Sequence, residues 1–440
     1  MAKTLILDAQ IVASGKVSRG SVLINDGRIY DIIPDGQQTP SADDVFDASG
    51  LLLFPGAIDA HVHFRDPGLT HKADMASESA AAVAGGVTTV MDMPNVKPQT
   101  TTVEELDTKL VRACTLMRTN FSAYIGATND NLDQVLATDF RHVCGIKLFM
   151  GSSTGGMLVD SDDALRTLFR NAPALIAAHC EDESIIRKNS EAAKSAFGDE
   201  TPWSQHPLIR SAEACLVSSS RAAQLAREAG ARLHILHVTT AAELDLLDRG
   251  DNRLVTGEVC PAHLWFSDED YDRLGSLIKC NPAVKSKADR GALRHAVAQG
   301  VISTIGTDHA PHTLAEKSGH TYWQTPSGMP MIEHSLPLML RLADEGWWDY
   351  TTVAARMAED VAELYHIADR GHIRVGQWAD LALVKPQNHV VHGARYKCGW
   401  TPLEGLQLNH QVVRTYVSGQ LAFADGFVFD RCGMLLDFLK

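Results

Sequence analysis

The strongest constraint on the fold is a series of eight apolar, strand-like segments between residues 55 and 375, separated by segments with helical patterns. The strand candidates are 57–64, 86–95, 120–128, 144–151, 174–180, 232–239, 254–264 and 301–310. Strands that alternate with helices in this way are typical of parallel βα units. Eight such units within this length predict a TIM-like (β/α)8 barrel.

The two ends of the chain follow a different pattern. Both alternate short β-rich runs with turns rich in Gly, Asn and Asp, such as "NDG" at 25–27 and "ADG" at 424–426. Such runs are typical of antiparallel strands joined by tight turns. We therefore predict an α/β protein in which residues 55–375 form the barrel, while residues 1–54 and 376–440 together form a small accessory β-sandwich.

Composition excludes several classes of function. The formal charge is −14, and no cluster of Lys and Arg could neutralise a nucleic-acid backbone. With 45% hydrophobic and 21% charged residues, the chain has the composition of a globular enzyme. It shows neither a run of about 18 apolar residues nor a secretory leader, so we expect a cytoplasmic protein with no membrane partner. The expected partner is a small molecule, and a homodimer stays open.

The eight cysteines contain no C-x-x-C pair and indicate reduced thiols rather than a disulfide framework. Cys180 stands beside His179, but free cysteines are common in protein cores, and we interpret it as structural.

The first barrel strand carries an unusual row of polar residues. In "PGAIDAHVHFRDPG", residues 55–68, the side chains of Asp59, His61, His63 and Arg65 alternate with apolar ones and should share one face. A half-buried strand with solvent-facing imidazoles alternates in the same way. The choice between that and a functional face depends on the other strands.

In a (β/α)8 barrel the active site lies at the carboxyl ends of the strands. Polar residues stand at or near the ends of most predicted strands, namely Asp92, Asn95, Lys147, His179, His237, His263, Asp308, His309 and His312. His237 ends an apolar run just before "TTAAELDLL", where a Thr can cap a helix, so its ring should reach the barrel mouth. His234 lies earlier in the same strand and is read as structural.

Four histidines (His61, His63, His179 and His237) and Asp308 suit Zn²⁺ or a similar divalent ion. Five ligands would crowd one metal, whereas two metals would use them all. An unmodified ammonium at Lys147 cannot bind metal, and by spacing alone this lysine could equally pair with a barrel carboxylate.

The motifs "DAHVHFRDPG", "DMPNVKP", "GIKLFMGSS", "AAHCEDE", "LHILHVTT" and "GTDHAPHT" resemble the amidohydrolase superfamily, and within it the dihydroorotases. The match runs over most of the chain. This resemblance implies the same barrel and accessory β-sandwich. It also implies two zinc or other divalent ions: His61 and His63 would bind one with Asp308, and His179 and His237 the other. An N6-carboxylated Lys147 would bridge them. Some relatives carry an Asp in the bridging region, but Asp160 comes well after the strand.

The resemblance also implies substrate contacts. Arg65, Asn95 and His312 would bind a substrate carboxylate, since the planar guanidinium pairs with carboxylate in a bidentate way. Asn281 in "KCNPAVKS" matches a substrate-contacting loop, whereas Lys285 stands where many relatives have arginine. His263 is a further site candidate.

The activity implied is reversible hydrolysis of the cyclic amide of L-dihydroorotate to N-carbamoyl-L-aspartate, a step of pyrimidine synthesis. Asp308 would accept a proton from the attacking hydroxide and deliver it to the leaving nitrogen. Allantoinase and hydantoinase are the nearest alternatives. An inactive homologue that serves as a partner of aspartate transcarbamoylase is disfavoured by the intact ligand set. The segment 312–330 is read either as a mobile lid or as a long surface connection.

Overall fold

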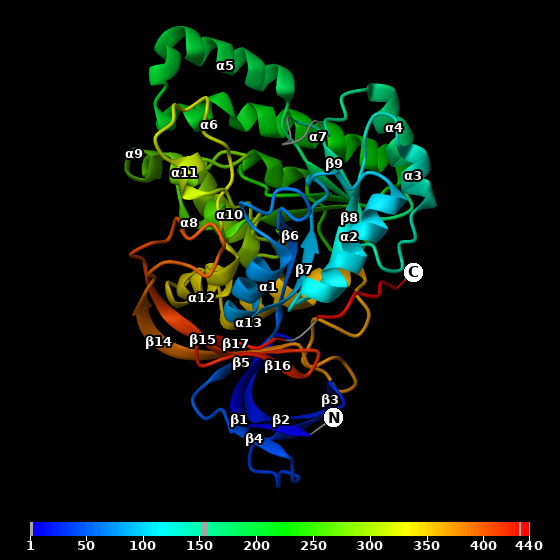
Figure 1. Cartoon of the computed structure of the whole chain (residues 1–440), viewed down its shortest axis with the longest axis vertical. Helices are drawn as coiled ribbons and strands as arrows, with labels where there is room; N and C mark the ends of the chain where they lie inside the picture. Colours follow the sequence, from blue (N-terminus) through cyan, green and yellow to red (C-terminus); the bar gives the residue numbers. More distant parts are fainter. Residues whose placement is uncertain (1–2, 152–156, 251, 431–432, 440) are drawn as a thin grey trace.

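The computed structural model describes residues 3–151, 157–250, 252–430 and 433–439, and these residues form two sheets and the helices around them (Figure 1). The larger body contains an eight-stranded parallel sheet surrounded by helices. The second sheet lies at one end of the molecule, where the blue and red strands of the two chain ends lie side by side. This arrangement is the predicted fold class.

The parallel sheet is a nearly closed barrel whose strands follow one another in chain order. Its strands are β6 (Ala57–Val62), β7 (Val87–Asp92), β8 (Asn120–Gly126), β9 (Gly145–Phe149), β10 (Ile176–His179), β11 (Leu233–Ile235), β12 (Val255–Val259) and β13 (Thr304–Ile305). Val62 forms a parallel bridge with His309, and the His63 N–H donates to His309 O at 2.8 Å. The segment after the last strand therefore meets the first strand.

Helices follow the strands and cover the barrel (Figure 1). The longer ones are α1 (Met75–Ala84), α2 (Val103–Leu116), α4 (Asp162–Asn171), α5 (Glu183–Phe197), α7 (Ala212–Ala229), α10 (Lys287–Ala298) and α12 (Ser335–Asp344). Shorter ones are α3 (Leu132–Ala137), α6 (His206–Ile209), α8 (Pro261–Trp265), α9 (Tyr271–Leu274), α11 (Leu314–Lys317), α13 (Tyr350–Ala354) and α14 (Asp360–Tyr365).

Local sequence explains how the helices begin and how they pack. Asp74 caps α1 in a capping box with Ser77, which satisfies backbone N–H groups of the first turn. In α4 the buried residues Leu165, Leu168 and Phe169 recur at the spacing of one helix face, so this face packs inward.

The helix expected after His237 is only a short 3-10 helix, Ala242–Leu246. Thr240 still accepts a hydrogen bond from the Glu243 N–H, as a capping residue would.

The accessory sheet has nine strands within the described residues, in the order β17-β16-β15-β14-β5-β1-β2-β3, with β4 paired to β1. They are β1 (Thr4–Ala13), β2 (Lys16–Asn25), β3 (Arg28–Pro34), β4 (Asp44–Asp47), β5 (Leu52–Pro55), β14 (Leu381–Val390), β15 (Gln407–Val417), β16 (Gln420–Ala424) and β17 (Phe427–Val428). The two chain ends meet where β14 pairs antiparallel with β5.

Both predicted turns are two-residue hairpin connections. Asp26 and Gly27 have φ of 51° and 79°, and Asp425 and Gly426 have φ of 50° and 85°. Positive φ at both central residues matches the right-handed twist of the flanking strands.

Within the described ranges, no helix is both long enough and apolar enough to cross a membrane. The seven described cysteines are free thiols, and Cys180 is buried. The eighth, Cys432, lies outside the described residues.

Candidate active site

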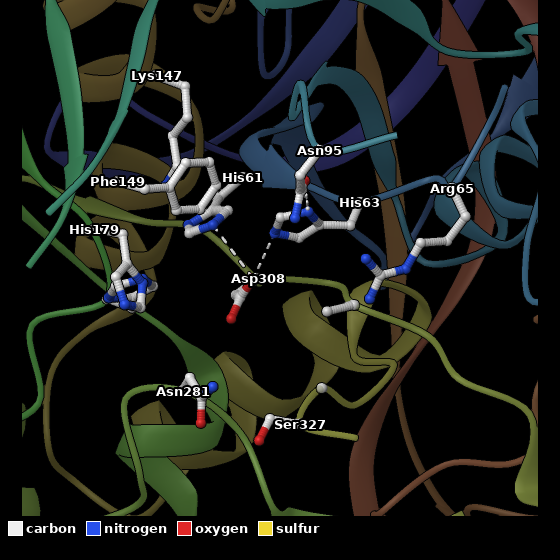
Figure 2. Close-up of a pocket in the computed structure, with 13 residues that line it drawn as sticks. His61, His63, Arg65, Asn95, Lys147, Phe149, His179, Asn281, Asp308 and Ser327 are labelled. Carbon is white, nitrogen blue, oxygen red and sulfur yellow. Dashed lines mark hydrogen bonds and ion pairs between the residues drawn. The ribbon is translucent and has the colours of Figure 1, made fainter. Parts of the chain in front are cut away.

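A pocket lies at the carboxyl ends of the barrel strands, the position at which (β/α)8 barrels carry their active sites. It brings together nine of the eleven predicted site residues, namely His61, His63, Arg65, Asn95, Lys147, His179, His237, Asn281 and Asp308. Phe149, Ala310, Ser327 and Gly328 complete the lining. Figure 2 shows how most of these side chains point toward a common centre near Asp308.

His61 and His63 meet at Asp308 (Figure 2). The Nε2 atoms of the two rings lie 3.3 and 3.0 Å from Asp308 Oδ1. The Nδ1 atom of His61 lies 2.7 Å from Glu258 Oε1. The Nδ1 atom of His63 lies 2.7 Å from Asn95 Oδ1.

These partners decide which ring nitrogens face the pocket. Because an oxygen acceptor requires a proton on Nδ1, a neutral ring presents its Nε2 lone pair to Asp308. Two nitrogen lone pairs and a carboxylate oxygen therefore converge, and their ligand atoms lie within 4.8 Å of one another. A divalent cation satisfies this arrangement, whereas the three acceptors alone repel one another.

His179 and His237 form a second pair. His179 Nδ1 lies 2.9 Å from His237 Nε2. Glu181 Oε2 lies 3.0 Å from His179 Nε2, which places the ring proton there and leaves the Nδ1 lone pair facing His237. The rings of His61 and His237 are 5.3 Å apart, so the two groups adjoin. The donor set therefore fits two neighbouring divalent ions.

Burial keeps these imidazoles uncharged. It lowers the pKa of His61 to about 3 and that of His63 to about 4, although Asp308 acts in the opposite direction on both. Burial also lowers the pKa of His179 and of His237. Neutral imidazoles are the form that binds metal.

Lys147 extends from β9 into the pocket. Its side chain is buried, and its Nζ lies 4.4 Å from the centre of the Phe149 ring. Burial lowers the pKa of the amine to about 7, although Asp308 and Glu258 act in the opposite direction. A large fraction of the amine is therefore neutral near pH 7 and can act as a nucleophile.

Arg65 points into the pocket beside His63 (Figure 2) and is 3% exposed. Its Nε donates to Pro311 O at 3.2 Å, and a terminal nitrogen lies 3.4 Å from His312 Nε2. His312 lies behind Arg65 rather than in the lining, with its Nδ1 3.0 Å from Lys72 Nζ. Because Lys72 can only donate to Nδ1, the ring proton lies on Nε2, which donates to Ser327 O at 3.0 Å. His312 therefore lies beside Arg65 without accepting a hydrogen bond from it.

The two asparagines line the pocket from different sides, as Figure 2 shows. Asn95 orients His63. Asn281 Oδ1 is buried and has no hydrogen-bond partner among the described residues, so it is free to bind a ligand. His263 lies away from the lining, with its Nε2 3.1 Å from Pro282 O under the loop that carries Asn281.

The backbone turns several candidate side chains inward at points where strands end. β6 ends at Val62, so the expectation that Arg65 continues the strand alternation is wrong. Arg65, His237 and Asp308 have φ of 63°, 39° and 48°. This left-handed conformation costs about 1 kcal/mol or more for a residue with a Cβ, and such strain is common at functional sites.

Two fully buried carboxylates that orient metal-ligand candidates were not identified from sequence. Glu258, the partner of His61, is the only charged residue of β12, and this was the available signal. Glu181, the partner of His179, is held by Arg210, whose Nη2 lies 2.5 Å from Glu181 Oε2. It stands within the quoted motif "AAHCEDE".

Several other polar residues singled out from sequence have structural partners outside the lining. Asp92 accepts from the Phe64 N–H and pairs with Lys109 at 2.7 Å. His309 Nε2 lies 2.7 Å from Glu78.

The two residues set aside in the comparison with the family also lie outside the lining. Asp160 accepts from Asn129, and Lys285 donates to Ala283 O. Ser152 and Ser153, which end the motif "GIKLFMGSS", lie outside the described residues.

Known proteins resemble this chain over nearly its whole length. Residues 52–422 match the amidohydrolase family. A dihydroorotase from Halobacterium salinarum is 36% identical over 407 residues, covering 89% of this chain and 92% of the relative. An allantoinase from Rubrobacter xylanophilus is 34% identical over 441 residues, covering 95% of each. The solved structure of an L-hydantoinase (dihydropyrimidinase) from Arthrobacter aurescens superimposes with a TM-score of 0.93 at 27% identity, covering 99% of this chain and 100% of that one.

Proposed function

The chain belongs to the amidohydrolase family, and we propose that it hydrolyses the cyclic amide of L-dihydroorotate to N-carbamoyl-L-aspartate. The more general proposal is a hydrolase of cyclic amide C–N bonds. The family match, the dihydroorotase relative and the hydantoinase neighbour support it.

Arg65 is the observation that favours a substrate with a carboxylate. Its guanidinium lies buried in the pocket, its Nε donates to Pro311 O, and no carboxylate of the described residues forms an ion pair with it. Asp308 and Asp92 stabilise its charge only from beyond ion-pair distance. A buried cation without a directly paired carboxylate is unfavourable, and a substrate carboxylate would pair with it through two parallel hydrogen bonds. Dihydroorotate carries such a carboxylate on its ring, whereas allantoin and hydantoin carry none.

His61, His63 and Asp308 would hold one divalent ion, and His179 and His237 would hold a second. Nitrogen and carboxylate donors of this kind favour zinc. When bound, the ions supply the acidity that makes hydroxide available near neutral pH and the positive charge that polarises an amide carbonyl. Metal analysis of the purified protein should give close to two divalent ions per chain. A reproducible value near one would contradict the binuclear proposal.

Lys147 would bridge the two ions as its N6-carbamate. Its neutral amine can add to CO₂ with loss of one proton, which converts a group that cannot bind metal into an anionic oxygen ligand. The lowered pKa of the amine supports this proposal. Mass spectrometry under native conditions should show the additional mass of CO₂, and Lys147→Met should lose it.

Asp308 is the proposed acid and base. Its carboxylate stands at the centre of the pocket next to His61 and His63 (Figure 2), where it can take a proton from the attacking water and return it to the ring nitrogen as the C–N bond breaks. Asn95 and Asn281 would orient the ring from the two sides of the pocket.

Allantoin or hydantoin hydrolysis is the second candidate, favoured by the allantoinase relative and the hydantoinase structure. Steady-state assays with dihydroorotate, allantoin, hydantoin and dihydrouracil side by side decide between them. The highest kcat/KM should be that for dihydroorotate, and a higher value for a ring without a carboxylate would overturn the substrate proposal.

A further inference from the structure

The pocket has two walls of different construction. The strand wall consists of His61, His63, His179, His237 and Asp308. The loop wall consists of Asn281, Ser327 and Gly328, which line the pocket from segments without regular structure. Figure 2 shows Asn281 and Ser327 across the pocket from His61 and His63. A wall made of loop backbone can position a substrate only if neighbouring groups fix it.

Lys317, the last residue of α11, joins the two segments of the loop wall. Its side chain is 1% exposed, and its Nζ donates to Lys279 O at 3.2 Å, Pro326 O at 3.0 Å and Gly328 O at 3.0 Å. Two of these carbonyls flank Ser327. The third lies two residues before Asn281.

Lys279 makes the reciprocal connection. Its Nζ donates to Tyr322 O at 2.7 Å and Thr325 O at 2.6 Å, and it lies 4.2 Å from the centre of the Tyr322 ring. Its carbonyl also accepts from the Gly328 N–H at 2.9 Å. Each lysine therefore bonds to the segment that contains the other.

His206 provides a further connection at the same place. Its Nδ1 lies 2.7 Å from the Tyr322 hydroxyl and its Nε2 lies 2.7 Å from Cys280 O. Burial lowers the pKa of the ring, so the neutral imidazole donates to Cys280 O and accepts from Tyr322. The residue next to Asn281 is thus fixed as well.

These buried ammonium groups are a poor choice for stability alone. Burial lowers the pKa of Lys317 to about 7 and that of Lys279 to about 8. The three carbonyl acceptors around Lys317 Nζ nevertheless require the three N–H groups of the ammonium form. An apolar side chain of similar size would avoid this desolvation. Apolar side chains could not, however, bond the five carbonyl groups of the two segments that the lysines hold together.

The loop wall also has little room to move toward the strand wall. Gly328 has φ of 135°, and a Cβ at this position would lie 2.5 Å from Ala310 O. The Ala310 N–H donates to Met329 O at 3.0 Å. The wall therefore packs against the residues that follow Asp308, with the lysines behind it.

We propose that Lys317 and Lys279 are positioning residues that fix the loop wall and thereby set the size of the ring that the pocket accepts. The proposal rests on the proposed function only in taking this pocket as the place where a cyclic amide binds.

The test compares Lys317→Met and Lys279→Met with a matched control. Arg294→Met removes another buried cation, on α10, which donates to Leu264 O at 2.8 Å and packs on Trp347 outside the pocket. Lys317→Arg keeps a cation that can donate to several carbonyls. For each protein, kcat and KM are measured with the six-membered dihydroorotate and dihydrouracil rings and the five-membered hydantoin ring. Metal content and amide hydrogen exchange are measured in parallel.

For both lysine variants we expect kcat/KM to fall about 10-fold or more, mainly through KM, with unchanged metal content. The ratio of kcat/KM for six-membered rings to that for five-membered rings should move toward one. Lys317→Arg should restore part of the lost kcat/KM. Exchange at the Gly328 N–H should become faster in the lysine variants and not in Arg294→Met.

Three results overturn the proposal. They are wild-type KM and ring preference in a folded lysine variant, equal effects in Arg294→Met, and unchanged exchange at Gly328. If Lys317→Met does not fold, Lys279→Met, which removes two hydrogen bonds instead of three, is judged by the same results. If the wild-type protein hydrolyses none of the rings, the proposed function fails, while hydrogen exchange still decides whether the lysines fix the wall.

Discussion

The strand wall and the loop wall face each other across one pocket, yet different forces hold them. Each of three histidines of the strand wall stands at or just after a barrel strand, and its far nitrogen faces one buried acceptor: Glu258 for His61, Asn95 for His63 and Glu181 for His179. The loop wall has no strand behind it in the described residues, and buried ammonium groups hold its backbone. The contacts of the strand wall thus fix individual side chains, whereas those of the loop wall fix segments of backbone.

The difference suggests a division of labour. Regular strands hold the groups that require accurate placement for chemistry, and a loop supplies the surface that selects the ring. Substitutions in the strand wall should therefore change kcat or metal retention. Substitutions behind the loop wall should change KM and ring preference.

Asp308→Asn should have the largest effect. The amide has the same shape and leaves the fold intact, but it can neither take nor return a proton, so we expect kcat to fall by about 10²- to 10⁴-fold. The measurement is kcat with the best ring substrate, together with circular dichroism and metal analysis. Near-normal kcat in a variant that retains its metals would show that a group outside the strand wall transfers the proton.

Substitution of Glu258 tests how the orientation of His61, a candidate metal ligand, affects metal binding while His61 itself is kept. Glu258→Leu removes the acceptor for the His61 Nδ1 proton, so the ring can adopt the other tautomer, and metal affinity should fall about 10- to 100-fold. Glu258→Gln keeps an oxygen acceptor and should lose less. Competition with a chelator measures the metal affinity of the two variants. Equal losses in the two variants would show that the acceptor does not orient His61.

Arg65→Met tests substrate recognition between the two walls. Loss of a charge-assisted hydrogen bond, about 1.5 to 3 kcal/mol, should lower kcat/KM for dihydroorotate by at least about 10-fold. Dihydrouracil has no carboxylate, so its kcat/KM should change little, and metal content should stay the same. If both substrates lose activity equally, Arg65 supports the structure of the site rather than binding a carboxylate.

The sequence predicts the strand wall well because its information is local. A histidine that ends an apolar run must lie at a strand end, and parallel strands bring their ends together. His179 and His237 follow this rule, alternation along the first strand predicts His61 and His63, and all four line the pocket. The two-residue turns of the accessory sheet are equally local, since Asp-Gly specifies a hairpin by its own backbone preferences.

The family resemblance names Asn281 of the loop wall, but the contacts that hold this wall could not be predicted because they are long-range. Lys317 and Lys279 are 38 positions apart, and nothing in either local sequence indicates that their ammonium groups bond carbonyls in the other's segment. The same limit applies to Glu258, whose partner His61 is 197 positions away. His263 shows the reverse case: it follows a strand, as the ligand candidates do, but the chain has turned into α8 and its ring lies outside the lining.

The smallest effect is expected at the rim of the loop wall, where Lys72 pairs with Glu316 of α11 at 2.8 Å. The two side chains are 14% and 31% exposed, so solvent screens the pair, and such pairs contribute about 0 to 1 kcal/mol. Glu316→Gln breaks this pair but leaves the contact of Lys72 with His312 Nδ1 in place. It should therefore lower kcat/KM by no more than about 5-fold, and added salt should bring the wild-type protein closer to the variant. Lys287→Met, which breaks an exposed pair with Glu269 on the outside of the barrel, serves as the control and should change nothing. Steady-state kinetics at low and high ionic strength checks this. A loss as large as that expected for Lys317→Met, with no response to salt, would mean that α11 is held from its exposed side as firmly as from its buried one, and that the lysines behind the wall do not act alone.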